Sequence, residues 1–478
     1  MSKTLETVVP VTDVAEVVHH GEKFIIPEAL TINQAIDVLY KRGEYLEATV
    51  EIAEKFDVFP FDGAYALSQV IQERYGWAQG KSIISMFGEQ KPQIFKIPCS
   101  VSEKVDVPWG HFELPNVDGV IMTSADRSAT GRFIFNLTAQ VKRKDEPTIR
   151  ALFDELREYL KTHSLYRGKA IKIRFRDDEG NPHSMPEPEF MDVSGISPDG
   201  LLLNDDLTHS INANLFTPIT RVKDCLDNNI KVKRGILLGG KYGTGKTLAA
   251  TVAARLAQDN GITYVYTPRA DELGDAIAFA KQYQSPACVV FCEDIDRSIT
   301  GGRTVKIDDI LNILDGIDTK GENIITVLTT NHLTDVNQAM LRPGRLDAIL
   351  DIVPPDAKTA SRLARHYGGG AINKGEDLSS VGDALAGQIP AVIEETVKRA
   401  KLFQLALLDE GEIVTDLSAQ ALHQAAVTMT TQIELLKEVA DPEAPALDVA
   451  FSESVKVVMD PIEKKVKKLS DKFEQQFG

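Results

Sequence analysis

Residues 234–247 read RGILLGGKYGTGKT, an apolar run followed by a glycine-rich turn. The run from Ile236 to Leu238 predicts a buried parallel strand, and the apolar spacing after Thr247 predicts a helix. In this setting the glycines, the lysine and the threonine fit the pattern G-x-x-x-x-G-K-[ST]. Glycines let backbone N–H groups turn inward around phosphate oxygens, and the start of the helix adds a partial positive charge. The stretch therefore predicts a nucleotide site.

The side chains of this loop have separate expected tasks. Lys246 can reach the β- and γ-phosphates, and the Thr247 hydroxyl can ligate Mg²⁺. The alternative is a glycine-rich turn that binds nothing, and the matching strand and helix argue against it. The predicted nucleotide-binding residues of the loop are Gly240, Lys241, Tyr242, Gly243, Thr244, Gly245, Lys246, Thr247 and Leu248.

Length, charge and cysteine use exclude several classes of protein. The chain of 478 residues is long enough for about three domains. Its 53 basic and 70 acidic residues give a formal net charge of −17, which disfavours nucleic acid as a partner without excluding a local basic patch. The 4 cysteines show no metal-ligand spacing, and Cys288 and Cys292 are expected to be buried thiols in a reduced setting. Without a signal peptide or a run of about 18 apolar residues, we expect a cytoplasmic protein with no membrane contact.

The first 205 residues give no catalytic signal. Apolar residues at helical spacing within 28–79, after an N-cap at Thr31, predict a mainly helical region at 1–92. Short β-type runs broken by proline and glycine predict a β-rich subdomain at 93–205. We therefore expect an α+β N-terminal region.

Strands and helices alternate from Thr217 onward, which predicts a parallel sheet with helices on both faces in an α/β domain at 206–375. The expected strands are 235–239, 262–267, 287–292, 324–330 and 349–353.

Acidic residues follow the third of these strands. Glu293 and Asp294 leave its carboxyl end, where open α/β sheets bind ligands. Phosphoryl transfer needs one carboxylate to hold Mg²⁺ and a second to orient the attacking water. Asn331 ends the next strand, where its amide could contact the γ-phosphate or the water, or could simply form a turn.

Two arginines surround a Pro-Gly step further along the chain. Arg342 and Arg345 suit phosphate contact, or an arginine finger that reaches a neighbouring subunit. The alternative is a surface ion pair with Asp347.

Together these residues resemble the AAA ATPases of the AAA+ superfamily, over residues 214–408. The resemblance rests on five motifs in the family's order, namely Gly240–Thr247 (Walker A), Val289–Asp296 (Walker B), Leu311–Gly316 (the Asp-Gly turn), Ile324–Asn331 (sensor 1) and Leu341–Asp347 (arginine fingers). It implies a P-loop ATPase domain that binds ATP and Mg²⁺, with Thr247 and Glu293 toward the metal and Asp294 polarising water.

The resemblance also implies a helical lid at 376–445, in which Pro390 and Ala391 close over the adenine. It further implies a homo-oligomeric ring, usually a hexamer, in which Arg342 and Arg345 reach the γ-phosphate of a neighbour.

Three departures from the family pattern are present. Lys241-Tyr242 replaces two prolines of Walker A, and Glu293-Asp294 inverts the usual Asp-Glu order of Walker B. Residues 269–283 have no aromatic residue before Phe279, where an aromatic pore loop usually stands. The mitochondrial Rieske-protein translocase group is similar in the inversion and in lacking that loop, and it also carries a β-rich region before its ATPase domain.

The C-terminal tail, 446–478, has apolar residues at near-helical spacing and lysines at 464, 465, 467 and 468. It predicts a helix that packs on the ring or on a partner, with a membrane-surface helix as the alternative.

We therefore expect an ATP-hydrolysing ring that remodels a macromolecular partner, most simply a protein bound through residues 1–205. One alternative is a DNA-associated motor or loader. Another is a slow, nucleotide-gated oligomeric scaffold, which the inverted Glu293-Asp294 pair would suit.

Overall fold

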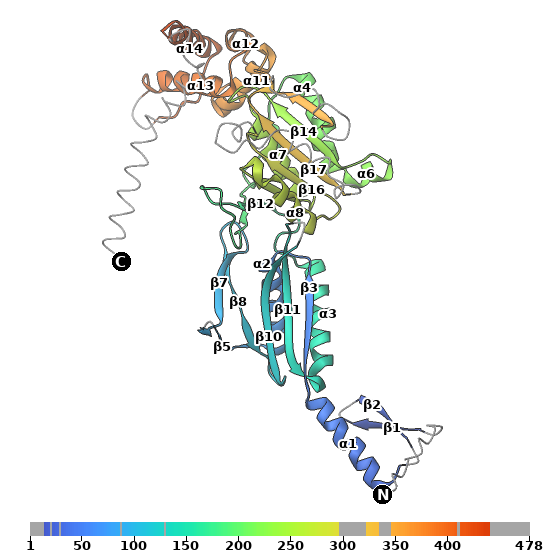
Figure 1. Cartoon of the computed structure of the whole chain (residues 1–478). Coiled ribbons are helices and arrows are strands. Elements are labelled where there is room, and N and C mark those ends of the chain that lie inside the picture. Colours follow the sequence, from blue (N-terminus) through green and yellow to red (C-terminus); the bar gives the residue numbers. More distant parts are fainter. Residues whose placement is uncertain are drawn as a thin grey trace, which may run out of the picture. The chain divides into compact units, whose positions relative to one another are not determined.

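The computed structural model describes residues 14–19, 22–27, 30–86, 88–128, 131–295, 322–333, 346–408 and 412–439. Contacts group the chain into two compact units, Met1–Tyr166 and Arg167–Gly478 (Figure 1). The expected domain boundary after residue 205 falls inside the second unit, because two short strands before it belong to the sheet of that unit. None of the helices in the described residues is long and apolar enough to cross a lipid bilayer.

The first unit opens with a hairpin and a helix. Strands β1 (Val14–His19) and β2 (Glu22–Pro27) pair antiparallel, and α1 (Ile32–Glu47) follows. The Thr31 hydroxyl accepts a hydrogen bond from the Gln34 N–H, and the Gln34 side chain accepts one from the Thr31 N–H at 2.9 Å. These two residues therefore form a capping box at the start of α1.

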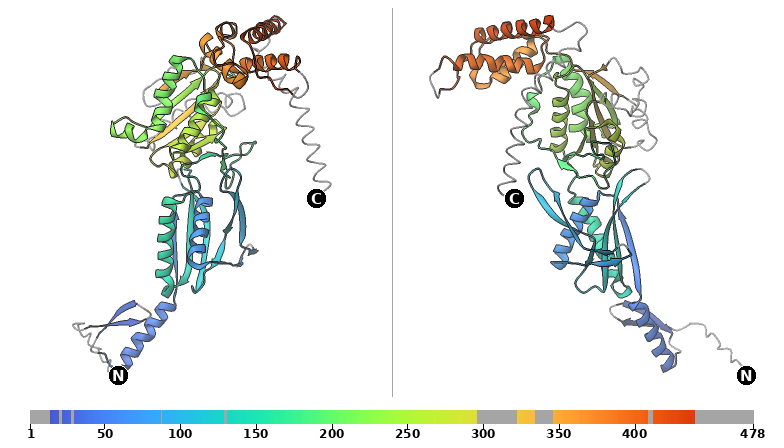
Figure 2. Two further views of the ribbon diagram at one scale, coloured as in Figure 1. Left: turned by 180° about the vertical axis from the view of Figure 1, so that it is seen from behind. Right: turned by 60° about the vertical axis from the view of Figure 1, so that its left-hand side comes forward.

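A five-stranded antiparallel sheet of order β3-β11-β10-β9-β4 forms the body of the first unit. Helices α2 and α3 contact each other and β11, so both cover the same face of the sheet (Figures 1 and 2). The elements are β3 (Thr49–Phe56), α2 (Pro60–Tyr75), β4 (Gln79–Gly80), β9 (His111–Glu113), β10 (Gly119–Arg127), β11 (Phe133–Lys142), η1 (Arg143–Asp145) and α3 (Glu146–Thr162). Two further hairpins pair β5 (Ile83–Ser85) with β6 (Gly88–Gln90) and β7 (Gln93–Pro98) with β8 (Lys104–Trp109).

Strand β3 interrupts the stretch 28–79, for which we expected helix. Its sequence TVEIAEKF alternates between sides: Ile52 and Phe56 are buried on one face, while Glu51 and Lys55 are exposed on the other. This period of two is the strand signal, and helical spacing in the flanking segments hid it. The described part of residues 1–92 is therefore a mixture of strands and two helices.

The second unit is built on a seven-stranded sheet of order β13-β12-β15-β16-β17-β14-β18. All neighbouring strands run parallel except β12 and β13. The strands are β12 (Ala170–Lys172), β13 (Glu189–Phe190), β14 (Arg234–Gly239), β15 (Thr263–Thr267), β16 (Cys288–Cys292), β17 (Ile324–Thr330) and β18 (Ala348–Asp351). The predicted parallel α/β sheet is confirmed, and β12 with β13 extends it.

Helices cover both faces of this sheet. Alternate strand residues such as Ile236, Val289 and Ile325 pack with α7 (Lys246–Asp259) in one buried core. Through α7 the chain passes from β14 to β15 in one direction along the sheet, and through α8 (Leu273–Gln282) it passes from β15 to β16 in the other direction. Because crossovers between parallel strands are right-handed, α8 lies on the face opposite α7. Before β14 lie η2 (Pro198–Gly200), α4 (Asp205–Ile211), η3 (Asn212–Phe216), α5 (Thr217–Thr220) and α6 (Val222–Asp227), and η4 (Ala270–Glu272) precedes α8.

A helical lid follows the last strand and has a buried core of its own. Its elements are α11 (Ala357–Gly368), η8 (Gly369–Ala371), α12 (Ser379–Leu385), α13 (Pro390–Leu405) and α14 (Ala419–Val439). Asp356 begins α11, since its side chain accepts a hydrogen bond from the Thr359 N–H at 2.7 Å. Because Ala360 and Leu363 of α11 belong to the lid core, the lid begins about twenty residues before the expected residue 376.

Candidate active site

The predicted phosphate loop is the turn between β14 and α7. Gly240, Gly243 and Gly245 have φ angles of 140°, 76° and 110°, which residues with side chains rarely adopt. A Cβ on Gly240 would come within 2.4 Å of the Ile352 carbonyl oxygen. The buried Thr244 hydroxyl donates to the Lys241 carbonyl at 2.8 Å. The curvature of the loop therefore depends on glycine and is fixed by Thr244.

Lys246 is the first residue of α7, and its side chain is buried in the loop. Its ammonium nitrogen donates to the carbonyls of Gly240 and Lys241 at 2.7 Å and 2.9 Å. A third bond, 2.7 Å long, reaches Oδ1 of Asn331 at the end of β17. The positive charge is thus held between the phosphate loop and the neighbouring strand.

Two hydroxyl groups, from α7 and β15, meet at the Glu293 carboxylate. The Thr247 hydroxyl donates to Oε1 at 2.7 Å, and the Tyr266 hydroxyl at the end of β15 donates to Oε2 at 2.8 Å. Burial, together with the Glu293 carboxylate, raises the pKa of Tyr266 well above its ordinary value of 10.0. Tyr266 therefore stays protonated and acts as a donor that fixes the second oxygen of Glu293.

Asp294 is held in an unusual backbone conformation. Its φ is +44°, a region that non-glycine residues enter at a cost of roughly 1–3 kcal/mol. The Asp294 N–H donates to the Thr329 hydroxyl at 2.8 Å, and the Asn331 amide nitrogen donates to Asp294 Oδ1 at 3.1 Å. These bonds turn the carboxylate toward Asn331, while Glu293 faces Thr247.

Two contributors, Tyr266 and Thr329, were not foreseen from the sequence. Each is a polar residue near the carboxyl end of a largely buried strand beside β16. That position is the available signal, because the carboxyl ends of parallel strands meet at one edge of a sheet.

The turn before α13 lies against the phosphate loop. A Cβ on Gly243 would come within 3.0 Å of the Ile389 side chain, and Pro390 begins α13 directly afterwards. Pro390 and Ala391 thus begin the lid helix directly after Ile389, the residue that lies against the loop.

The residues present fit a nucleotide with Mg²⁺. The glycine turn leads into the N-terminus of a helix, and the buried Lys246 ammonium provides positive charge for phosphate oxygens. The Thr247 hydroxyl and Glu293 carboxylate offer hard oxygen ligands of the kind that Mg²⁺ prefers.

Other predicted residues lie outside the described part of the chain, namely Arg342, Arg345, Asp296 and the turn 311–316. Asp347 is described. Its carboxylate accepts a hydrogen bond from the Gly235 N–H at 2.9 Å, and its own N–H donates to the Gly235 carbonyl at 2.7 Å. These two bonds tie Asp347 to the start of β14.

Residues 269–283 form η4 and α8. The aromatic residues of this segment, Phe279 and Tyr283, are both buried. Over these described residues no aromatic side chain is exposed in the way that a pore loop would require.

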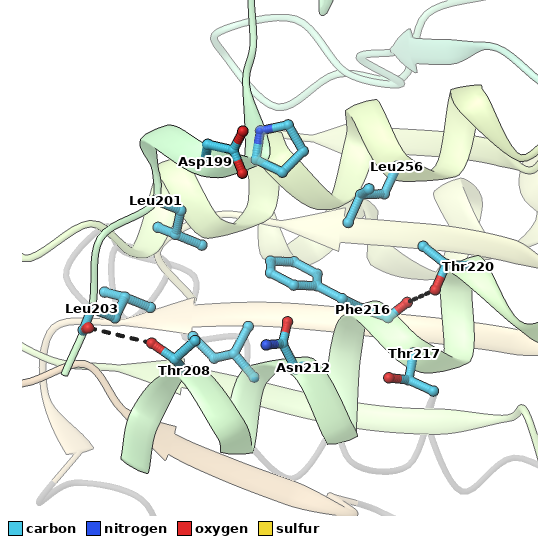
Figure 3. A pocket seen from close by; sticks show the side chains of 11 residues that line it. Asp199, Leu201, Leu203, Thr208, Asn212, Phe216, Thr217, Thr220 and Leu256 are labelled. Carbon is cyan, nitrogen blue, oxygen red and sulfur yellow. Dashed lines mark hydrogen bonds between the residues drawn. The ribbon is translucent and has the colours of Figure 1, made fainter. Parts of the chain in front are cut away.

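A pocket of about 390 Å³ lies elsewhere in the second unit (Figure 3). It is bounded by the strap from Pro198 to Leu203, by the helical segment from Thr208 to Thr220, and by Leu256 of α7. None of the residues that we predicted to bind nucleotide lines it.

Comparison with known proteins agrees with this geometry. Residues 236–353 match the sequence model of the ATPase family associated with various cellular activities (AAA). The match extends from β14 through β18 and so contains the phosphate loop, Glu293, Asp294 and Asn331.

Three relatives illustrate the similarity. The chain is 29% identical to a cell division cycle protein 48 homolog of Archaeoglobus fulgidus, over 44% of this chain and 31% of the relative. It is 27% identical to a 26S proteasome regulatory subunit 4 homolog of Schizosaccharomyces pombe, over 44% and 50%. It is 35% identical to ATP-dependent zinc metalloprotease FtsH 1 of Symbiobacterium thermophilum, over 28% and 25%. The matched part thus spans a quarter to a half of these relatives' lengths.

Proposed function

We propose that this chain, which carries an AAA ATPase domain at residues 236–353, hydrolyses ATP and uses the energy to remodel a protein partner. The observation that carries the proposal is the bonded cluster of Lys246, Thr247, Glu293, Asp294 and Asn331 at one edge of the sheet. An isolated glycine turn would not need this arrangement. Two of the relatives, a proteasome regulatory subunit and an ATP-dependent metalloprotease, have names that belong to protein-degrading machinery.

Each residue of the cluster has a task in phosphoryl transfer. Lys246 offsets charge on the phosphate oxygens, and Thr247 with Glu293 holds the metal. Mg²⁺, when bound, would supply Lewis acidity toward the phosphate oxygens. Asp294 orients the attacking water, whose oxygen bonds to the γ-phosphorus while the bond to the ADP oxygen breaks. Asn331 is hydrogen-bonded to both Asp294 and Lys246 and so fixes the position of one side chain relative to the other.

The contacts of the two carboxylates support this order of roles. Glu293 is bonded to the Thr247 hydroxyl, the expected metal ligand, whereas Asp294 is bonded to Asn331. In the usual Asp-Glu order of the family the shorter side chain comes first, whereas here the longer side chain, Glu293, comes first. Tyr266 compensates by holding the far oxygen of the longer Glu293 side chain.

The proposal extends to assembly and partner. Arg342 and Arg345 would reach the γ-phosphate bound to a neighbouring subunit, which requires a ring and most simply a hexamer. The first unit, Met1–Tyr166, would bind the protein partner, because it lies outside the ATPase unit and has no catalytic motif of its own. The net charge of −17 disfavours the alternative of a DNA motor or loader.

Two substitutions test the roles of the carboxylates. Asp294→Asn should retain ATP binding and lose hydrolysis by about 100-fold or more, because water orientation is lost. Glu293→Gln should lower the rate and raise the Mg²⁺ concentration needed for half-maximal hydrolysis, because a charged metal ligand is lost. Nucleotide binding by fluorescence and phosphate release would be measured together, with Lys246→Ala as the binding-deficient control. Normal hydrolysis by Asp294→Asn beside an inactive Glu293→Gln would reverse the assignment.

A further inference from the structure

A short connection joins the last strand of the sheet to the first helix of the lid. Strand β18 ends at Asp351 and α11 begins at Ala357, and we call residues 352–356 between them the hinge segment. Figure 2 shows the lid helices, coloured orange to red, gathered at one end of the second unit. Pro355 of the hinge segment is buried, whereas connecting segments usually lie on the surface. The hinge segment is therefore packed against other parts of the unit.

Asn204 lies where the core of the sheet and the core of the lid meet. In the strap that precedes it, Leu203 is buried in the core formed by the sheet and α7, whereas Leu202 packs against the core of the lid. Asp205, which follows it, begins α4 and pairs with Lys358 of α11 at 2.6 Å. The backbone on either side of Asn204 is thus attached to the lid.

The Asn204 side chain binds the hinge segment and not its own helix. Asn204 is the N-cap residue of α4, where asparagine usually bonds to the first turn of the helix, yet within the described α4 it makes no such bond. Its amide nitrogen donates to the Pro354 carbonyl at 3.4 Å, and its amide oxygen accepts a hydrogen bond from the Asp356 N–H at 2.9 Å. Because Asp356 is the N-cap residue of α11, the same amide fixes the start of the lid.

The residue between these two bonds leads on to the phosphate loop. The Pro355 carbonyl accepts a hydrogen bond from the Gly387 N–H at 2.8 Å. Gly387 turns the chain with a φ of 77°, and Ile389, two residues later, lies against Gly243 of the phosphate loop. Contacts therefore run without a gap from Asn204, through the hinge segment and the turn 387–389, to the loop.

We propose that Asn204 is a positioning residue for ATP, which holds the turn 387–389 against the phosphate loop. The inference rests on the proposed function. Where the turn is displaced, the loop loses its contact with Ile389, so the affinity for ATP falls with the fraction of molecules that have the turn in place. At saturating ATP the bound nucleotide selects the molecules with the turn in place, and the rate of hydrolysis is then unchanged.

The variant Asn204→Ala tests the proposal through ATP binding and steady-state kinetics. We expect the Kd, measured by displacement of a fluorescent ATP analogue, and the KM for ATP to rise roughly 5- to 30-fold, with kcat within about twofold. Asn204→Asp can still accept the bond from Asp356 but cannot donate to Pro354, so its Kd should lie between the two. This second variant also gives a result should the alanine variant fail to fold.

Asn323 provides the matched control. Its side chain also donates to a proline carbonyl, that of Pro286, at 3.1 Å. Both residues precede their strands, β17 and β16, and so lie at the edge of the sheet opposite the carboxyl ends that carry the site. Asn323→Ala should therefore leave the Kd and the KM for ATP unchanged.

Hydrogen–deuterium exchange provides a readout that needs no ATP. Because the Gly387 N–H donates to the hinge segment, peptides that cover 385–389 should exchange at least about fivefold faster in Asn204→Ala than in the unchanged chain. A merely structural bond would lower the urea midpoint of the unit without changing the Kd for ATP at low urea.

Three outcomes would overturn the inference. The first is an unchanged Kd in folded Asn204→Ala, whether or not exchange within 385–389 becomes faster. The second is an equal loss of affinity in Asn323→Ala, which would show a general loss of stability. The third is a fall in kcat with an unchanged KM. Failure of the proposed function would look different, because the unchanged chain itself would then bind no ATP.

Discussion

Replacing Tyr266 with phenylalanine would remove one hydroxyl group and leave the ring of β15 in place. That hydroxyl donates a 2.8 Å hydrogen bond to Glu293 Oε2, on the side of the carboxylate away from Thr247. A hydrogen bond to a charged group contributes about 1.5–3 kcal/mol. Because Tyr266 is partly exposed, water would replace part of this, and we expect a loss of about 1–2 kcal/mol.

We expect this loss to weaken Mg²⁺ binding and to change the affinity for ATP much less. A change of about 1–2 kcal/mol corresponds to a roughly 5- to 30-fold rise in the Mg²⁺ concentration needed for half-maximal ATPase rate. ATP binding measured without Mg²⁺ should change little, because Lys246 and the loop are untouched. The assay is steady-state phosphate release over a titration of Mg²⁺.

Tyr264 provides the matched control. It lies two residues earlier on β15, and its hydroxyl donates to the Ala250 carbonyl at 2.9 Å rather than to Glu293. Tyr264→Phe should lower the stability of the domain by about 1 kcal/mol and leave the Mg²⁺ dependence unchanged. Equal Mg²⁺ curves for Tyr266→Phe and the unchanged protein would refute the reasoning, as would an equal shift in Tyr264→Phe.

The pKa of Tyr266 gives the same comparison a pH test. Burial and Glu293 raise this pKa above 10.0, so the hydroxyl remains a donor at any pH below that value. The ratio of the rates of the unchanged protein and Tyr266→Phe should therefore stay constant between about pH 7 and pH 9. A ratio that collapses within this range would mean that the hydroxyl ionises there.

Two further predictions concern backbone shape and a buried carboxyl group. Gly240→Ala would place a Cβ about 2.4 Å from the Ile352 carbonyl oxygen, at a φ of 140°. The affinity for ATP, measured in a binding titration, should therefore fall roughly 10- to 100-fold. An unchanged affinity would contradict the argument that this position requires glycine. Asp62 is fully buried and accepts hydrogen bonds from Ser164 Oγ and the Leu165 N–H, each 2.7 Å long. Asp62→Asn should cost about 1–3 kcal/mol in urea unfolding, whereas the exposed Asp57→Asn should cost less than about 1 kcal/mol.

The ATPase sheet was predictable because its signal is local. Each central strand is a short apolar run, and burial on both faces requires such a run whatever the neighbours are. The positions of Lys246, Thr247, Glu293 and Asn331 followed, because the carboxyl ends of parallel strands share one edge. The bonds of Lys246 to Asn331 and of Thr247 to Glu293 join residues that the motifs had already singled out.

Features that depend on distant pairing were not predictable in the same way. β12 joins the sheet by pairing with β15, about ninety residues later, and its three residues carry no signal for that partner. β3 was hidden because its alternating pattern lies between two segments with helical spacing. Tyr266 was passed over because its role depends on the strand order that places β15 beside β16. In each case the missing information was the identity of a neighbour in space.

The most direct test of the account is the ATPase rate measured against protein concentration, beside the size of the assembly with and without Mg-ATP. We predict that activity per subunit rises as ATP-dependent rings form, and that Arg345→Ala retains ATP binding but loses hydrolysis. Adding subunits that carry Lys246→Ala, which cannot bind ATP but keep Arg345, should then restore part of the rate of the Arg345→Ala subunits. A rate that is independent of concentration, from a protein that stays monomeric, would contradict the ring and leave an isolated nucleotide switch.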